Sequence, residues 1–242
     1  IVEGDAKRVL VTKQNLSDLI GPAKFRRSDS ESADQVGVVN GLAWTSVGGE
    51  MLEIECAVMT GSGKLKLTGS LGDVMRESAD IAVSYVRTIA EKYHIDPDFY
   101  KTKDLHIHAP EGAVPKDGPS AGVTMVTAVV SALSGIPVRG DVAMTGEISL
   151  RGRVMPIGGL REKSMAAYRE NKKIVIIPKE NEPDLYEVDP VVKESVVFKP
   201  VERIEEVLEL ALVQPSETEE SKVLDAWCEP KTSSVSGETV RI

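Results

Sequence analysis

The sequence PKDGPSAG, residues 115–122, opens directly into the apolar run VTMVTAVVSAL, residues 123–133. The length and apolar character of that run predict a buried helix over Ala121–Leu133. A serine placed before such a helix most often caps it. Here only Pro, Ala and Gly surround Ser120, so little side-chain bulk shields its hydroxyl and another backbone can approach it closely. Two interpretations of Ser120 are therefore open, a helix cap or a nucleophile.

A nucleophilic serine needs donors for an oxyanion and a base for its proton. The start of the helix supplies free backbone N–H groups and the positive end of a helix dipole. Histidine is the first candidate base, because His106 and His108 fall on the same face of one expected strand. His94 is expected at the surface, near the end of a long helix. Against a Ser-His arrangement, Ser120 lacks the GxSxG context of a nucleophile elbow.

The alternative base is Lys163, in GGLREKSMAA. Its helical neighbours at spacings of three and four, Leu160, Ala166 and Ala167, are apolar. A lysine on an apolar helix face either extends its amine to water or holds it buried. A lysine amine can act as a general base only if burial in apolar surroundings or a nearby positive charge lowers its pKa toward neutrality. The residues around Lys163 leave both possibilities open.

Alternating and apolar runs flank this region and predict a mixed sheet with packed helices, an α+β fold. Expected strands include VGVVNGLAWT, MLEIECAVM, DLHIHAP, KKIVIIP and VVFKPV. The glycine-rich GSG at 61–63 is expected to be a hairpin turn, since the longer phosphate-binding pattern is absent. A long helix follows it, with a predicted core stripe that runs from Val74 to Ile89.

Composition narrows the class of function. The net charge is −9 and aromatic residues make up 4% of the chain, which argues against a nucleic-acid-binding surface. No apolar run is long enough to span a membrane. Cys56 and Cys228 are isolated, so we expect reduced cysteines, no metal site and a cytoplasmic location. The chain has no initiator Met and is expected to be a fragment of a longer protein.

Three stretches in order, PKDGPSAG, MTGEISLRG and PIGGLREK, resemble the proteolytic domain of the bacterial ATP-dependent Lon proteases. GLAWTSVGGE, GSLGDVMRESA and HIHAPEGAVP are similar to that family as well. The resemblance covers about Asp34 to Val213. It implies the Lon proteolytic-domain fold (ribosomal protein S5 domain 2-like), which is α+β with a mixed sheet.

The resemblance also implies a Ser-Lys catalytic dyad. Ser120 matches the nucleophile of the family and Lys163 matches the base. Thr145 and Glu147 match positions that lie near the dyad, where Thr145 would orient the lysine amine. Asp117 matches a position that contacts the lysine or its loop in some relatives. An Asp117–Lys163 pair would favour the charged amine and a resting state, and the alternative is a turn residue.

The family further implies an enzyme that degrades misfolded and regulatory proteins, with unfolded polypeptides as substrates and a hexameric ring as its assembly. Residues 35–213 would form the proteolytic domain, residues 1–34 a linker and residues 214–242 a flexible tail. No cofactor is expected in this chain, because ATP and Mg²⁺ bind a separate module in the family and no Walker A pattern occurs here. The alternative function is a non-catalytic Lon-like scaffold for oligomerisation.

Overall fold

The computed structural model describes residues 10–21, 33–45, 48–110 and 115–213. Strands and helices alternate irregularly along these segments. The strands form one seven-stranded sheet and one two-stranded ribbon. Helix α1 (Leu16–Ile20) buries none of its residues. None of the helices in the described part of the chain has the length and apolar character that a membrane crossing needs.

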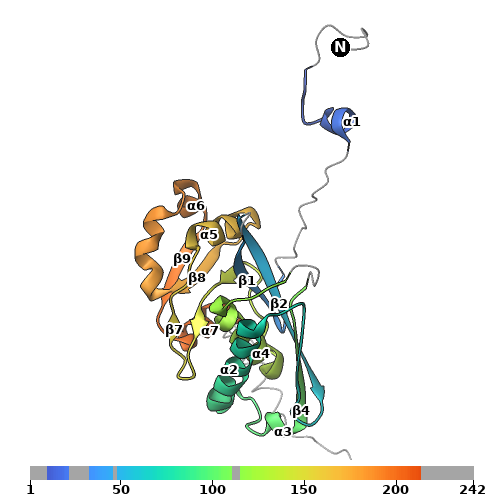
Figure 1. Cartoon of the computed structure of the whole chain (residues 1–242), viewed down its shortest axis with the longest axis vertical. Helices are drawn as coiled ribbons and strands as arrows, with labels where there is room; N and C mark the ends of the chain where they lie inside the picture. The colour runs from blue at the N-terminus through green and yellow to red at the C-terminus, as the bar shows by residue number, and fades with distance from the viewer. Residues whose placement is uncertain (1–9, 22–32, 46–47, 111–114, 214–242) are drawn as a thin grey trace, which may run out of the picture.

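The large sheet has the order β3-β4-β2-β1-β5-β8-β9 (Figure 1). Its strands are β1 (Val38–Thr45), β2 (Gly48–Thr60), β3 (Leu65–Thr68), β4 (Lys103–His108), β5 (Val142–Met144), β8 (Ile174–Pro178) and β9 (Val197–Val201). The β1–β2 and β2–β4 pairs are antiparallel, and the remaining pairs are parallel. The predicted mixed sheet of an α+β fold is therefore confirmed.

Two separate apolar layers cover the two faces of the sheet. Alternate residues of β5 show this directly, because Val142 and Met144 pack in one core cluster and Ala143 packs in the other. The larger layer holds α2 (Asp73–Ile89), α4 (Gly122–Ser134) and α7 (Ile204–Ala211). The smaller layer holds α5 (Leu160–Arg169) and α6 (Pro190–Ser195), which lie beside β8 and β9 in Figure 1.

Short elements complete the connections. They are the helices η1 (Ala90–Tyr93), α3 (Phe99–Thr102), η2 (Pro119–Ala121) and η3 (Lys179–Glu187), and the ribbon strands β6 (Glu147–Ile148) and β7 (Val154–Met155). Gln35 pairs with Val138, and the N–H of Val213 donates to the carbonyl of Pro137 at 2.9 Å. Residues near both ends of the segment 33–213 are thus attached to one stretch, residues 137–138.

The glycine-rich segment 61–63 is a turn, but the predicted hairpin is wrong. β3 pairs with β4, which lies between β2 and β3 in the sheet. The reason is Asp104 at the start of β4, whose carboxylate accepts the N–H groups of Ser62 and Lys64, each at 2.8 Å. These bonds hold the turn against the N-terminal end of β4. The chain therefore crosses this strand, and β3 pairs with the edge of β4 opposite β2.

The predicted core stripe of α2 is confirmed at Ala82, Tyr85 and Val86 and is wrong at Val74. Val74 is 42% exposed, whereas Met75, Ala79, Ala82 and Val86 are buried. The buried series recurs at spacings of three and four from Met75, and Val74 lies about 100° away from it around the helix. After α5, Asn171 has φ 55°, the left-handed conformation that commonly ends a helix.

Replacing Ile54 with Ala tests which face of β2 carries the core. Ile54 has no exposed surface, and Met59 on the opposite face of the same strand is 46% exposed. Ile54→Ala should lower the free energy of unfolding by about 2–5 kcal/mol, because it removes buried methyl groups and leaves a cavity. Met59→Ala is the matched control and should change it by less than about 0.5 kcal/mol. Urea unfolding of both variants measures the difference, and equal losses would contradict the assigned faces.

Candidate active site

Ser120 lies in the single turn η2 and leads directly into α4. Gly122 brings this turn against the ribbon, since a methyl group on Gly122 would lie 2.7 Å from Cγ2 of Ile148. The carbonyl of Ser120 accepts the N–H of Gly146 at 2.9 Å, and Gly146 in turn accepts the N–H of Val123 at 3.1 Å. These contacts fix the serine backbone, while its side chain stays half-buried at the surface of a cleft.

Lys163 comes from the other layer of the fold. It lies in the first turn of α5, where its N–H donates to the carbonyl of Gly159 at 3.0 Å, and the residue is only 3% exposed. Its amine reaches the opposite layer, because Nζ lies 3.0 Å from Oγ of Ser120 and 3.1 Å from Oγ1 of Thr145. Of the two possibilities that the sequence left open for this amine, the structure has the buried one.

Burial changes the acidity of this amine. Removal from water disfavours the charged form and lowers the pKa of Lys163 to about 8. An amine with that pKa is neutral in about one molecule in ten at pH 7, far more than an amine with the ordinary pKa. A neutral amine within hydrogen-bond distance of a serine hydroxyl has the geometry and the proton affinity of a general base.

Thr145 connects the two members of the pair. It directly follows β5 and is 1% exposed, and its N–H donates to the carbonyl of Ile176 at 3.1 Å. Its hydroxyl accepts from Nζ of Lys163 and donates to the carbonyl of Ser120 at 3.4 Å. The predicted contact between Thr145 and the lysine amine is present, and it holds that amine on the side of the serine.

The pair lies in the wall of a cleft of about 710 Å³. Apolar side chains of β1, β2 and α2 form much of the lining, among them Leu42, Trp44, Met51, Leu52 and Met75. The segments 115–121 and 156–159 form the remaining walls with Glu50 and Glu162. An extended peptide can therefore approach Ser120 with apolar side chains in contact with the cleft.

Asp117 lies in the same loop but does not pair with the lysine. Its carboxylate accepts the N–H of Gly118 at 2.9 Å and that of Met75 at 3.1 Å. Met75 is in the first turn of α2, so Asp117 caps a helix whose own N-cap residue, Gly72, has no side chain to do so. Asp117 therefore anchors its loop to the start of α2 and makes no hydrogen bond to the lysine amine in the described residues.

Comparison with known proteins identifies the family. Residues 10–214 match the model of the Lon protease (S16) C-terminal proteolytic domain. The chain is 55% identical over 214 residues to a Lon protease of Brevibacillus choshinensis, which covers 88% of this chain and 28% of that protein. This chain belongs to the Lon proteolytic-domain family. It is also 56% identical over 213 residues to Lon protease 1 of Bacillus subtilis (strain 168), covering 88% of this chain and 28% of that protein.

A Lon protease of Brucella abortus (strain 2308) is 54% identical over 217 residues, which cover 90% of this chain and 27% of that protein. The chain thus spans little more than a quarter of the length of these Lon relatives.

The other candidates in this Lon domain make no hydrogen bond to Ser120 or Lys163 within the described segments. Glu147 begins the strand β6, is half-buried and pairs with Met155 in the ribbon, and no hydrogen bond joins it to the dyad in the described segments. His106 and His108 both contact Oγ1 of Thr68, at 2.9 and 2.7 Å, and neither lines the cleft. The two histidines therefore have a local partner instead of Ser120.

The cysteines and metal-ligating residues give no second site in the described segments. Cys56 is a free and buried thiol, and Cys228 lies outside the described residues. No group of three or more His, Cys, Asp or Glu in the described part of the chain is arranged to hold a metal ion. The expectation of no cofactor stays a prediction.

Two glycines bring the site together, and sequence reasoning missed the close approach at Gly49. Gly49 of β2 lies against the backbone of α5, where a methyl group would overlap the carbonyl oxygen of Glu162. Gly159 precedes α5 with φ 70°, and Trp44 packs directly on it. The repeated GG pairs of the sequence were the available signal, because paired glycines often mark a close approach of two backbones.

The buried lysine predicts how stability changes with pH. The pKa of Lys163 is about 8 in the folded state, whereas a solvated lysine in the unfolded chain has the ordinary value of 10.5. The unfolded chain therefore binds more protons between these pH values. Folded-state stability should therefore rise with pH in this window by up to ~3 kcal/mol, and Lys163→Met should lack that rise. Urea unfolding of both proteins from pH 7 to 10.5 measures the difference, and parallel curves would contradict the assigned burial.

Proposed function

We propose that this chain is a serine endopeptidase domain in which Ser120 is the nucleophile and Lys163 the general base. The observation that carries the proposal is the 3.0 Å contact between Nζ of Lys163 and Oγ of Ser120, made by a buried amine at the wall of an open cleft. Membership of the Lon proteolytic-domain family supports the same reaction class. Thr145 is proposed to position the amine.

The first half of the reaction forms an ester. Neutral Lys163 takes the proton of Ser120 while Oγ bonds to the peptide carbonyl carbon, and the carbonyl π electrons move to its oxygen. The backbone N–H groups of Ser120 and of the residue after it are the proposed donors to that oxyanion. Collapse breaks the C–N bond, and the ammonium returns its proton to the leaving amine.

Water completes the second half. Lys163, neutral again, takes a proton from a water molecule that attacks the ester carbonyl. Collapse of the second tetrahedral intermediate breaks the bond to Oγ of Ser120, which recovers its proton from the ammonium. The enzyme returns to its starting state with one peptide bond hydrolysed.

Asp117 has a conformational role in this proposal. Its carboxylate ties the loop before Ser120 to the start of α2. The loop therefore holds the serine in contact with the lysine amine, without a charge next to that amine. Glu147 is proposed as a supporting residue near the ribbon, outside the proton transfer.

The activity of the whole protein goes beyond this chain, and we propose it from the resemblance to Lon proteases. It is ATP-dependent degradation of misfolded and regulatory proteins in the cytoplasm, by a homohexameric ring that takes unfolded polypeptides as substrates. ATP and Mg²⁺ would bind outside residues 35–213, which we propose as the proteolytic domain. Residues 1–34 would be a linker and residues 214–242 a flexible tail.

The alternative function is a non-catalytic scaffold of the same fold. It is disfavoured because a scaffold has no need of a buried lysine amine in contact with a serine hydroxyl at a cleft, since desolvation of that amine lowers folded-state stability near neutral pH. Relatives at 52–56% identity carry the name Lon protease, which also supports the peptidase.

Ser120→Ala and Lys163→Met test the dyad. Each variant should lower cleavage of a fluorogenic unfolded peptide by about 10³-fold or more, because each removes one partner of a unit that acts together. A peptide boronate should label the wild-type chain at Ser120 and fail to label Ser120→Ala. The measurements are initial rates and mass spectrometry of the labelled chain.

A second buried lysine supplies the matched control. Lys172 is 4% exposed and burial lowers its pKa, but its amine donates to the carbonyl of Gly140 at 2.9 Å. Lys172→Met should therefore keep the wild-type rate per folded molecule within about threefold. Equal cleavage by wild type, Ser120→Ala and Lys163→Met would contradict the proposed dyad. A wild-type chain that is not labelled by the boronate would favour the scaffold function.

A further inference from the structure

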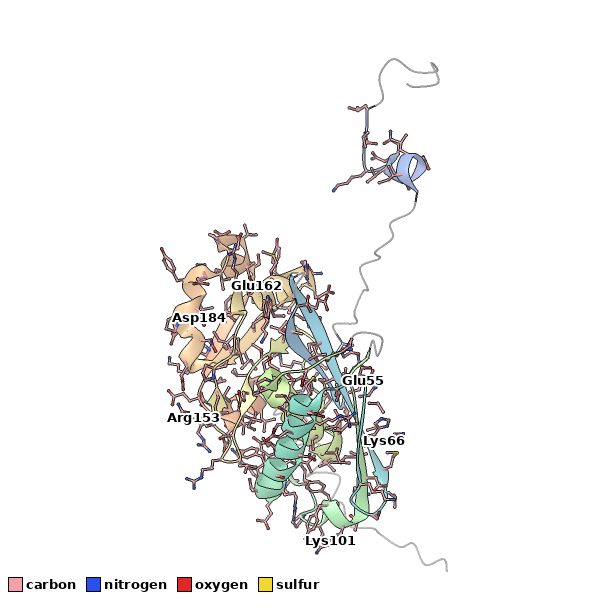
Figure 2. The ribbon with its side chains drawn as sticks, viewed as in Figure 1. Glu55, Lys66, Lys101, Arg153, Glu162 and Asp184 are labelled. Atoms are coloured by element: carbon pink, nitrogen blue, oxygen red, sulfur yellow. The ribbon has the colours of Figure 1, made fainter. Side chains whose placement is uncertain are left out.

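Gly49 of β2 lies against the backbone of α5, the helix that carries Lys163. Of the glycines in the described residues, Gly49 makes the closest contact with this helix. A methyl group on Gly49 would overlap the carbonyl oxygen of Glu162 and lie 2.9 Å from the backbone nitrogen of Lys163. Figure 2 labels Glu162 at this place, near the end of the β1–β2 pair. Only hydrogen fits between this strand and the first turn of α5.

Arg169, the last residue of α5, connects Gly49 to the other end of this helix. Its guanidinium donates from Nη2 to the carbonyl oxygen of Gly49, although Arg169 is exposed. Side chains of a helix lean toward its N-terminus, which lets the last residue of α5 reach back along the helix. Gly49 is thus held against α5 by its backbone contact and by a charged hydrogen bond.

We infer that Gly49 and Arg169 are positioning residues that set how far Lys163 reaches toward Ser120. The inference rests on the proposed dyad. Nζ of Lys163 is 3.0 Å from Oγ of Ser120 and 3.1 Å from Oγ1 of Thr145, so both bonds depend on where the first turn of α5 lies. If α5 lies farther from β2, the amine is farther from both hydroxyls and more accessible to water.

A single methyl group is enough to move the helix. Carbon and oxygen atoms in normal contact are separated by ~3.4 Å or more, so Gly49→Ala requires β2 and α5 to separate by more than ~1 Å. Displacement of a catalytic group by about 1 Å can lower a rate by about 10²-fold. Arg169→Ala adds no atoms and removes only the tie between the helix and the carbonyl of Gly49.

The effect on catalysis has a signature in the pH profile. The base acts when neutral, so the wild-type rate should rise with pH along a limb centred near the pKa of Lys163, about 8. A displaced and more hydrated amine keeps its proton to higher pH. Loss of folded protein alone would lower the rate at every pH without moving this limb.

The test compares kcat and the pH dependence of peptide cleavage by the 242-residue chain and its variants. Gly49→Ala should lower kcat by about 10-fold to 10²-fold with KM within about threefold, and should move the limb to higher pH. Arg169→Ala should do the same to a smaller degree, and Arg169→Lys should recover part of the loss. Arg161→Ala, an exposed arginine on the same helix, is the control and should match wild type.

Unchanged kcat and an unmoved limb in Arg169→Ala and Gly49→Ala would overturn the inference. If Gly49→Ala fails to fold, Arg169→Ala decides alone, since it introduces no overlap. A wild-type chain that neither cleaves peptides nor is labelled at Ser120 would instead remove the proposed dyad. If the wild type is active and is labelled at Ser120 but the variants behave like wild type, only the positioning roles of Gly49 and Arg169 are contradicted.

Discussion

The burial of one amine is the constraint on which the site depends. Nζ of Lys163 is enclosed at the junction of the two apolar layers, with the hydroxyls of Ser120 and Thr145 as its partners. Each layer supplies one member of the pair, since Ser120 precedes a helix of the larger layer and Lys163 lies on a helix of the smaller one. Both layers must be packed on the sheet before the two atoms meet. The same burial that lowers the pKa also lowers folded-state stability, which is the usual conflict between stability and function at a catalytic site.

The sheet brings the two helices close enough for this contact. β1 pairs with β5 only through Asn40 and Gly41, and β5 ends before Thr145. Thr145 and Gly146 therefore directly follow the end of a central strand. Thr145 binds the lysine amine, and Gly146 donates its N–H to the carbonyl of Ser120. Functional residues at the carboxyl ends of neighbouring parallel strands are a common result of this geometry. At the closest contacts between these elements, such as Gly49 against α5 and Gly122 against β6, a side chain larger than hydrogen would force one element to move.

Local patterns in the sequence predicted much of this and failed where distant residues decide. Alternation identified β2 and β4, and the apolar run identified α4, because each depends on burial within a single element. The place of β4 between β2 and β3 was not predictable, since it depends on Asp104 binding a turn 40 residues earlier. Asp117 likewise has its partner Met75 42 residues away. The dyad itself was predicted through resemblance to a family, while spacing alone left histidine and lysine both open as bases.

Direct titration of the Lys163 amine is the most decisive measurement for this account. In protein labelled with ¹³C at lysine Cε, the Lys163 signal can be assigned by its loss in Lys163→Met, and its chemical shift reports the protonation of Nζ. The Lys163 amine should titrate with a midpoint near 8, well below the ordinary value of about 10.4 for a solvated lysine. A midpoint of 10 or above for Lys163 would show a charged and hydrated amine at neutral pH, and would contradict its role as the base for Ser120.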